Sequence, residues 1–192
     1  AMTNPREAQA AVAHVRALLR AGVPASGIAV LSPYAAQVDL IRAALGAAAE
    51  AAAVEAAVGA AAGGFTAAGR DAALWRSLGA VEVATVDGFQ GREAEAVVLS
   101  LVRSNPRGTV GFLADQRRLN VAATRARRHL ALVCDSATLR RTPFLRTLLE
   151  HCAARGVWKG SGAAAELGGM RVVQARRDSS PAAAAGAAAR RW

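Results

Sequence analysis

The sequence predicts an α/β domain in which a parallel β-sheet is covered by helices on both faces. Short apolar runs, typical of buried strands, occur at residues 28–31, 81–85, 96–102 and 130–134. Helical patterns separate most of them, and such alternation favours a parallel sheet. Ligands of these sheets bind beyond the carboxyl ends of the strands. We therefore expect the loop 87–93 and the turn 32–37 to share one binding edge.

Three helical patterns surround these runs. The first covers residues 5–21, where Val12, Val15 and Leu18 recur at helical spacing. The second follows Ser32-Pro33 and the third covers residues 142–152. Each pattern has one apolar face, so each helix is expected to pack against the sheet.

The length of 192 residues and the apolar content of 53% fit one globular domain with its own core, which we place at residues 1–155. Within it, residues 46–79 are rich in Ala and Gly and predict a low-complexity insertion, partly helical or disordered. Leu74, Trp75 and Leu78 are candidates to dock its end. Residues 156–192 show no apolar period and predict a disordered basic tail, either without a role or adding non-specific nucleic-acid affinity.

The charge balance favours a polyanionic partner. A formal net charge of +10, from 24 basic and 14 acidic residues, suits nucleic acid, nucleotide phosphates or an anionic membrane surface. Lys159 is the only lysine. The excess of arginine fits bidentate phosphate contacts, and it equally fits a GC-rich genome.

Several observations bear on the compartment. Cys134 and Cys152 have neither metal-site nor redox-motif spacing, so we expect buried free thiols and a reducing intracellular setting, nucleus or cytoplasm. The three histidines also lack ligand spacing and predict packing or surface roles. No run of roughly 18 strongly apolar residues occurs, and we expect no membrane partner.

A basic stretch at residues 117–128 carries the first candidate for chemistry. On a helix at about 100° per residue, Leu119, Ala122, Ala123 and Ala126 form one apolar stripe, with Arg118 and Arg125 on one flank and Asn120, Thr124 and Arg127 on the other. An arginine anchored beside a packed stripe can stabilise the charge of phosphoryl transfer, and Arg125 is the first candidate. The alternative is a solvated basic face that binds nucleic-acid backbone without chemistry.

The loop before the second strand is the other candidate. Gly88 and Gly91 permit backbone amides to approach a phosphate or sugar, and Glu93 can accept hydrogen bonds from ribose hydroxyls. By itself, a G-x-x-G pattern also fits a tight strand connection.

Together the two stretches resemble a known family. V-D-G-F-Q-G-R-E-A-E-A-V-V-L-S-L-V-R-S-N at residues 86–105 and G-F-L-A-D-Q-R-R-L-N-V-A-A-T-R-A-R-R at residues 111–128 are similar to motifs V and VI of superfamily 1 helicases. The likeness is narrower for the 5′-to-3′ branch that contains the immunoglobulin mu-binding protein 2 and nonsense-mediated decay helicases. L-S-P-Y-A-A-Q-V-D-L-I-R at residues 31–42 resembles motif IV. The order and spacing match the second RecA-like domain, the C-terminal half of such motors.

The resemblance implies roles for individual residues. Arg125 takes the position of the arginine finger, which reaches the γ-phosphate of ATP held with Mg²⁺ by the first RecA-like domain. Gly91 and Glu93 fall where the family contacts the phosphate and ribose side of the nucleotide. Positions near the single-strand path are Ser32, Pro33, Tyr34, Thr85 and Val86. Gln90 and Arg118 are counted among the cofactor-binding residues and are expected to couple the two sites.

These 192 residues contain no G-x-x-x-x-G-K-[ST] phosphate loop and no acidic Mg²⁺ motif before the match, so the first RecA-like domain is missing. We therefore expect a C-terminal helicase motor domain that acts on single-stranded DNA or RNA and is inactive in ATP hydrolysis alone. The alternatives are a non-catalytic nucleic-acid-binding or regulatory module, and a truncated fragment.

Overall fold

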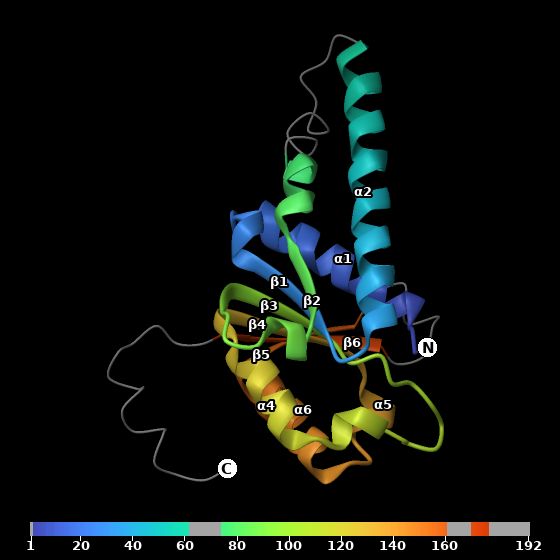
Figure 1. Ribbon diagram of the computed structural model, residues 1–192, viewed down its shortest axis with the longest axis vertical. Coiled ribbons are helices and arrows are strands. Elements are labelled where there is room, and N and C mark those ends of the chain that lie inside the picture. Colours follow the sequence, from blue (N-terminus) through green and yellow to red (C-terminus); the bar gives the residue numbers. More distant parts are fainter. Residues whose placement is uncertain (1, 62–73, 161–169, 177–192) are drawn as a thin grey trace, which may run out of the picture.

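The computed structural model describes residues 2–61, 74–160 and 170–176, and Figure 1 shows their arrangement. The helices are α1 (Pro5–Arg20), α2 (Ala35–Ala61), α4 (Gln116–Thr124), α5 (Ser136–Leu139) and α6 (Pro143–Arg155). The strands are β1 (Ile28–Ser32), β2 (Glu82–Thr85), β3 (Ala94–Ser100), β4 (Ala126–Asp135), β5 (Gly156–Gly160) and β6 (Met170–Arg176). Short 3₁₀ turns are η1 (Ala25–Gly27), η2 (Ser77–Ala80), η3 (Asp87–Phe89) and η4 (Gly111–Ala114).

One sheet organises the molecule. Its strand order is β2-β1-β3-β4-β6-β5. The first four strands are parallel, while β6 pairs antiparallel with both β4 and β5. Helices α1 and α2 lie on one face of the sheet, and α4, α5 and α6 lie on the other (Figure 1). The predicted fold class is confirmed.

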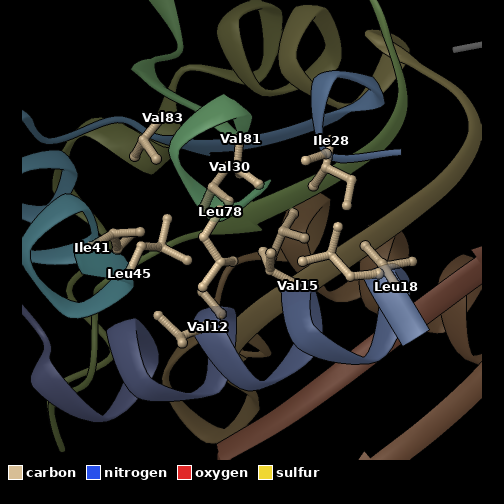
Figure 2. Close-up of a cluster of buried hydrophobic side chains, with 14 of the residues drawn as sticks. Val12, Val15, Leu18, Ile28, Val30, Ile41, Leu45, Leu78, Val81 and Val83 are labelled. Carbon is tan, nitrogen blue, oxygen red and sulfur yellow. The ribbon is translucent and has the colours of Figure 1, made fainter. Parts of the chain in front are cut away.

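Each central strand contributes side chains to two separate cores, because successive residues of a strand point to opposite faces. On β1, Ile28 and Val30 pack toward α1 and α2, whereas Ala29 and Leu31 pack toward the opposite face. Figure 2 shows the first core, in which Val12 and Val15 of α1 meet Ile41 and Leu45 of α2 and the β1 side chains. Burial on both faces explains why these strands read as continuous apolar runs.

The Ala-rich segment begins as a helix. α2 continues through residue 61 and extends beyond the sheet (Figure 1). The end of the segment docks as predicted: Trp75 and Leu78 are buried in the first core, and Leu74 packs against it. The guanidinium carbon of Arg16 stands 4.1 Å from the centroid of the Trp75 ring. Residues 62–73 lie outside the described residues.

The basic helix is shorter than predicted. It was expected to reach Arg128, but α4 ends at Thr124 and β4 begins at Ala126. The Thr124 hydroxyl donates to the carbonyl oxygens of Asn120 and Val121 and satisfies the last turn. Ala126 pairs with Ala94 of β3, so Arg127 belongs to a strand and the predicted helical flank containing it is wrong.

The prediction of a disordered tail is wrong for two stretches. β5 and β6 extend the sheet beyond β4, with Val173 of β6 opposite Leu132 and Trp158 opposite Val173. The apolar pattern there is too short to predict a strand from the sequence. Pairing of β6 with β4 stabilises the extended conformation. Residues 161–169 and 177–192 lie outside the described residues. No helix in the described ranges is long and apolar enough to cross a membrane.

Candidate nucleotide and nucleic-acid sites

The candidate residues occupy two opposite edges of the parallel sheet. The connection from β2 to β3 starts at the carboxyl end of β2 and finishes at the amino end of β3, so it crosses the sheet. Phe89 is buried in the core on the α4 side and anchors this crossing. The prediction that residues 87–93 share the carboxyl edge with the turn 32–37 therefore holds for Asp87 and is wrong for Glu93, which directly precedes β3.

The amino edge carries Arg125. This residue is the C-cap of α4, and its carbonyl oxygen accepts a hydrogen bond from the amide of Ala94 at 3.0 Å. Its Nε donates to the carbonyl oxygen of Val121 at 3.0 Å, and Nη1 lies 3.5 Å from the carbonyl oxygen of Arg92. The side chain is half-buried. Backbone pairing and the Nε bond together give this guanidinium a defined position.

Gly91 and Glu93 lie on the same edge. Gly91 has a φ of 82°, a conformation that side-chain-bearing residues rarely adopt, and a Cβ built there would meet no atom within 4 Å. Glu93 Oε2 accepts from Nε of Arg127 at 3.1 Å, and this bond raises the pKa of the Arg127 guanidinium. Arg92 forms an ion pair with Glu82 at the start of β2. Oppositely charged side chains thus alternate along this edge.

The resemblance assigns these residues to the phosphate and ribose side of a nucleotide, and their surroundings allow that role. The open space beside Gly91 leaves its backbone approachable, and Arg125 supplies a positioned cation. A carboxylate accepts through two oxygens, so the pairing with Arg127 does not prevent Glu93 from accepting a ribose hydroxyl. Among the described residues, no group of three or more His, Cys, Asp or Glu is placed to hold a metal ion.

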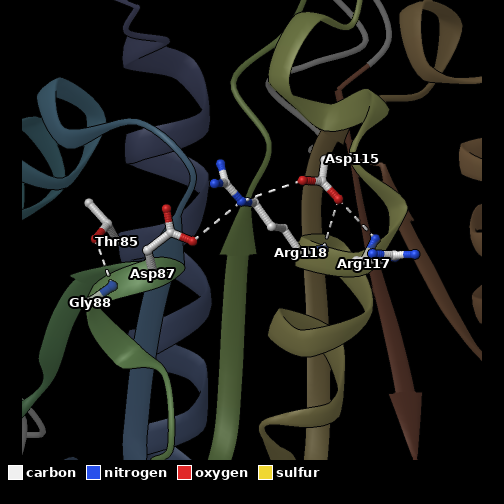
Figure 3. A network of polar contacts seen from close by, with 6 residues as sticks. All are labelled: Thr85, Asp87, Gly88, Asp115, Arg117 and Arg118. Carbon is white, nitrogen blue, oxygen red and sulfur yellow. Dashed lines mark hydrogen bonds and ion pairs between the residues drawn. The ribbon is translucent and has the colours of Figure 1, made fainter.

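The carboxyl edge gathers the residues assigned to the strand path. Ser32 is buried at the end of β1, and its carbonyl oxygen accepts from the amide of Val86 at 3.1 Å. Thr85 accepts from the amide of Gly88 through Oγ1 at 3.0 Å (Figure 3). Pro33 and Tyr34 follow Ser32 and are half-buried. The ends of β1 and β2 therefore hold the two predicted loops against each other.

Arg118 also lies at the carboxyl edge, near the start of α4. Its Nε is 3.7 Å from Oδ1 of Asp87 and 3.4 Å from Oδ2 of Asp115, so it bridges η3 and the N-cap of α4 (Figure 3). Its guanidinium carbon is 4.6 Å from the centroid of the Phe112 ring. Gln90 is exposed in the crossing connection, and its backbone N–H donates to the carbonyl oxygen of Asp87 at 3.2 Å. Of the two predicted coupling residues, Arg118 makes the contacts between elements.

Aromatic rings extend this edge. The rings of Tyr34 and Phe112 are tilted, with centroids 6.2 Å apart. Burial raises the pKa of the Tyr34 hydroxyl, and the nearby charge of Arg103 partly opposes that rise. Sequence reasoning missed both Phe112 and Arg103. Both lie inside the quoted stretches 86–105 and 111–128, but no local pattern there distinguishes them from their neighbours.

A buried polar cluster beneath this edge was missed as well. Glu7, Gln37 and Ser100 have no exposed surface, and Ser100 Oγ donates to Oε2 of Glu7 at 2.7 Å. Asn4 with Glu7 three residues later is a helix-start pattern, and Asn4 indeed caps α1. That pattern places Glu7 in the first helical turn but does not reveal its burial. The structure also brings His14 and His129 together, with Nε2 atoms 2.8 Å apart.

Comparison with known proteins shows the family of this chain. Residues 1–137 match the AAA domain family. This chain belongs to the AAA domain family. DNA-binding protein SMUBP-2 of Rattus norvegicus is 42% identical over 153 residues, which are 80% of this chain and 13% of that protein. DNA polymerase alpha-associated DNA helicase A of Schizosaccharomyces pombe is 42% identical over 138 residues, 72% of this chain and 16% of that protein.

A third relative is the DNA replication ATP-dependent helicase/nuclease DNA2 of Mus musculus, 35% identical over 154 residues, 80% of this chain and 12% of that protein. The chain thus spans 12–16% of the length of these three relatives. Their names support the resemblance to superfamily 1 helicases, and the parallel sheet with helices on both faces agrees with a RecA-like fold.

Proposed function

We propose that this AAA domain is the C-terminal motor domain of an ATP-dependent DNA or RNA helicase. It supplies the arginine finger and part of the nucleic-acid path, and it needs a first RecA-like domain for hydrolysis and unwinding. One observation carries the proposal: the nucleotide-type residues and the strand-path residues lie on opposite edges of one sheet, and α4 joins the edges.

On the amino edge, Arg125 is the arginine finger. ATP with Mg²⁺, held by the first domain, supplies the phosphoryl group that is transferred to water. The guanidinium of Arg125 stabilises the negative charge that develops on that group. The hydrogen bond from its Nε to the Val121 carbonyl oxygen restricts the conformations of the side chain. Gly91 brings backbone close to the phosphates, and Glu93 accepts from the ribose.

On the carboxyl edge, the loops after β1 and β2 grip a single strand. Pro33 and Tyr34 offer apolar and aromatic surface, while Thr85 and the amides near Val86 offer polar groups to the sugar-phosphate backbone. Such groups bind backbone with little base readout, so both DNA and RNA are candidate tracks.

Coupling follows from the connections between the edges. When the two domains close around ATP, Arg125 moves toward the γ-phosphate. Because Arg125 caps α4, the helix moves with it and shifts Arg118 relative to its partners Asp87 and Asp115. The 86–93 connection runs between the same two edges. A change in grip at the carboxyl edge therefore accompanies each nucleotide cycle.

The test is reconstitution. This domain is joined to a phosphate-loop RecA-like domain of the same family, and ATP hydrolysis is measured with and without single-stranded DNA or RNA. The proposal expects hydrolysis only in the joined protein, stimulated by the strand, with Tyr34→Ala lowering the stimulation. The proposal is contradicted if the joined protein folds but hydrolyses ATP at the same rate with single-stranded DNA, with single-stranded RNA and with neither.

A further inference from the structure

A cavity of about 650 Å³ opens at the carboxyl ends of β3 and β4, and none of the residues assigned above to the nucleotide or the strand path lines it. The start of α1 lines one side, and the loop that follows β3 lines the other. Its walls include Asn4, Arg6, Arg103, Ser104, Asn105 and Thr109. This volume lies within the range of small-ligand sites.

Glu7 organises the floor of the cavity. It has no exposed surface, and its Oε2 accepts from the Ser100 hydroxyl and from the Val102 amide, each at 2.7 Å. Asn4 Nδ2 donates to Glu7 Oε1 at 3.3 Å and to the Val102 carbonyl oxygen at 3.1 Å. These bonds join α1 to the first residues after β3.

They also hold Val102 in an unusual backbone conformation. Its φ is 68°, and in the described ranges Val102 is the one residue other than glycine with a positive φ. A β-branched residue rarely adopts this conformation unless its surroundings impose it, and such strain concentrates at functional sites. The consequence is a sharp turn, and the next residue, Arg103, lines the cavity.

Arg103 is positioned by further contacts. Its Nε donates to the carbonyl oxygen of Thr109 at 3.1 Å, and Nη1 lies 3.2 Å from the sulfur of Met2. A Cβ built on Gly111 would stand 2.8 Å from Nη2 of Arg103, so the glycine provides the room for this guanidinium. An arginine carries five N–H donors, more than these contacts use.

Arg103 connects the cavity to Tyr34. Its Nη2 lies beside Gly111, and the ring of the next residue, Phe112, has its centroid 6.2 Å from that of Tyr34. The charge of Arg103 also opposes the rise in the pKa of the Tyr34 hydroxyl. Asp135 also lines the cavity, and it accepts from Ser104 Oγ at 2.7 Å, from Thr138 Oγ1 at 2.9 Å and from the Ala137 amide at 2.9 Å. These donors partly neutralise the carboxylate charge of Asp135. The N-terminus of α1, the positive end of the helix dipole, also lies at the cavity.

We propose that this cavity is a second single-strand subsite, in which Arg103 binds a backbone phosphate of the nucleotide next to the one at Tyr34 and Glu7 is the positioning residue. The subsite rests on the proposed function, because it continues the strand path from the loop after β1 to the loop after β3. The ligand is the sugar-phosphate backbone, with the base or sugar filling the cavity.

The test uses the 192-residue chain and fluorescein-labelled oligothymidylate at low salt. Arg103→Ala is expected to weaken binding about tenfold, since a charge-assisted phosphate contact is lost, and to reduce the slope of log K against log salt by about 0.7. The matched control is Arg107→Ala, an exposed arginine in the same loop that does not line the cavity. Glu7→Ala should weaken binding to a similar degree, and Glu7→Gln, which keeps the shape, should restore it.

A label reports the position of the strand. Cys134 and Cys152 are buried, so Thr109→Cys provides one exposed thiol for a fluorophore, with Thr147→Cys on α6 as the control. Oligothymidylate should change the emission at position 109 and not at 147. Equal affinities for Arg103→Ala and Arg107→Ala, with weaker binding by Tyr34→Ala, would overturn the subsite and leave the proposed function intact. Absence of any binding by the folded unaltered chain would count against both.

Discussion

Arg118 and Arg125 stand near opposite ends of the same short helix and face different edges of the sheet. Arg118 bridges Asp87 and Asp115 at the carboxyl edge, whereas Arg125 meets Ala94 and the carbonyl oxygen of Arg92 at the amino edge. Seven residues of helix correspond to about 10 Å at 1.5 Å per residue. This spacing links the two candidate sites through one rigid element.

Arg118 is expected to matter for coupling more than for folding. Its side chain is 46% exposed, and surface ion pairs contribute about 0.2–1 kcal/mol, so Arg118→Ala should lower the free energy of unfolding by about 1 kcal/mol or less. Urea denaturation measures this. In the joined two-domain protein, the same variant should lose strand stimulation of ATP hydrolysis, and Asp87→Asn should lose it in part. A variant that unfolds, or one that keeps full stimulation, contradicts the role.

Gly91 and Gly111 offer a matched comparison. Both have positive φ, so each Gly→Ala change should cost about 1–2 kcal/mol of stability through backbone strain. A Cβ at position 91 meets open space, whereas at position 111 it displaces the end of the Arg103 side chain. The two variants should therefore have similar melting temperatures, while oligothymidylate affinity should fall only for Gly111→Ala. Equal oligothymidylate affinity of the two variants would show that Arg103 does not contact the bound strand.

Glu7 predicts a pH dependence of stability. Burial raises its pKa from 4.5 to about 7, despite the bonds from Val102 and Ser100 that oppose the rise. A folded-state pKa above the unfolded value means that Glu7 favours folding fully below about pH 4.5 and that this contribution is lost as pH rises through 7. Relative to Glu7→Gln, the unaltered protein should lose roughly 3 kcal/mol of unfolding free energy over that interval. Parallel denaturation curves across the interval would contradict the assignment.

Trp75 tests whether the end of the Ala-rich segment belongs to the domain. Its side chain is 2% exposed in the first core and lies under Arg16 and Arg20. Trp75→Ala should lower the unfolding free energy by about 3–5 kcal/mol, because a large buried side chain is lost. Val58→Ala is the control, since Val58 is 66% exposed on α2 and should change stability very little. Calorimetry of both variants decides the matter.

The sheet could be predicted from the sequence because its central strands are buried on both faces. Residues 28–31 and 130–134 read as continuous apolar runs for that reason, and both lie within strands. The end of α4 could not be predicted in the same way. The sequence A-A-T-R-A-R contains no glycine or proline, and it is the pairing of Ala126 with Ala94 that ends the helix.

The candidate site was predictable as a set of residues, not as a geometry. The motifs supplied Arg125, Glu93 and Tyr34, yet only the path of the 86–93 connection shows that they occupy two edges. Arg103 and Glu7 escaped notice because their roles depend on the conformation of Val102 and on burial, which no local pattern encodes. Long-range packing decides both.

The most direct measurement of the central claim is the turnover of ATP by Arg125→Ala in the protein that joins this domain to its phosphate-loop partner. Strand-stimulated kcat should fall by about 10³-fold or more, as expected for a lost arginine finger, while oligothymidylate binding stays within error of the unaltered protein. Arg128→Ala, which removes an arginine that is 81% exposed and paired with Glu95, is the matched control and should keep its kcat. An Arg125→Ala protein that turns over ATP as fast as Arg128→Ala would contradict the account.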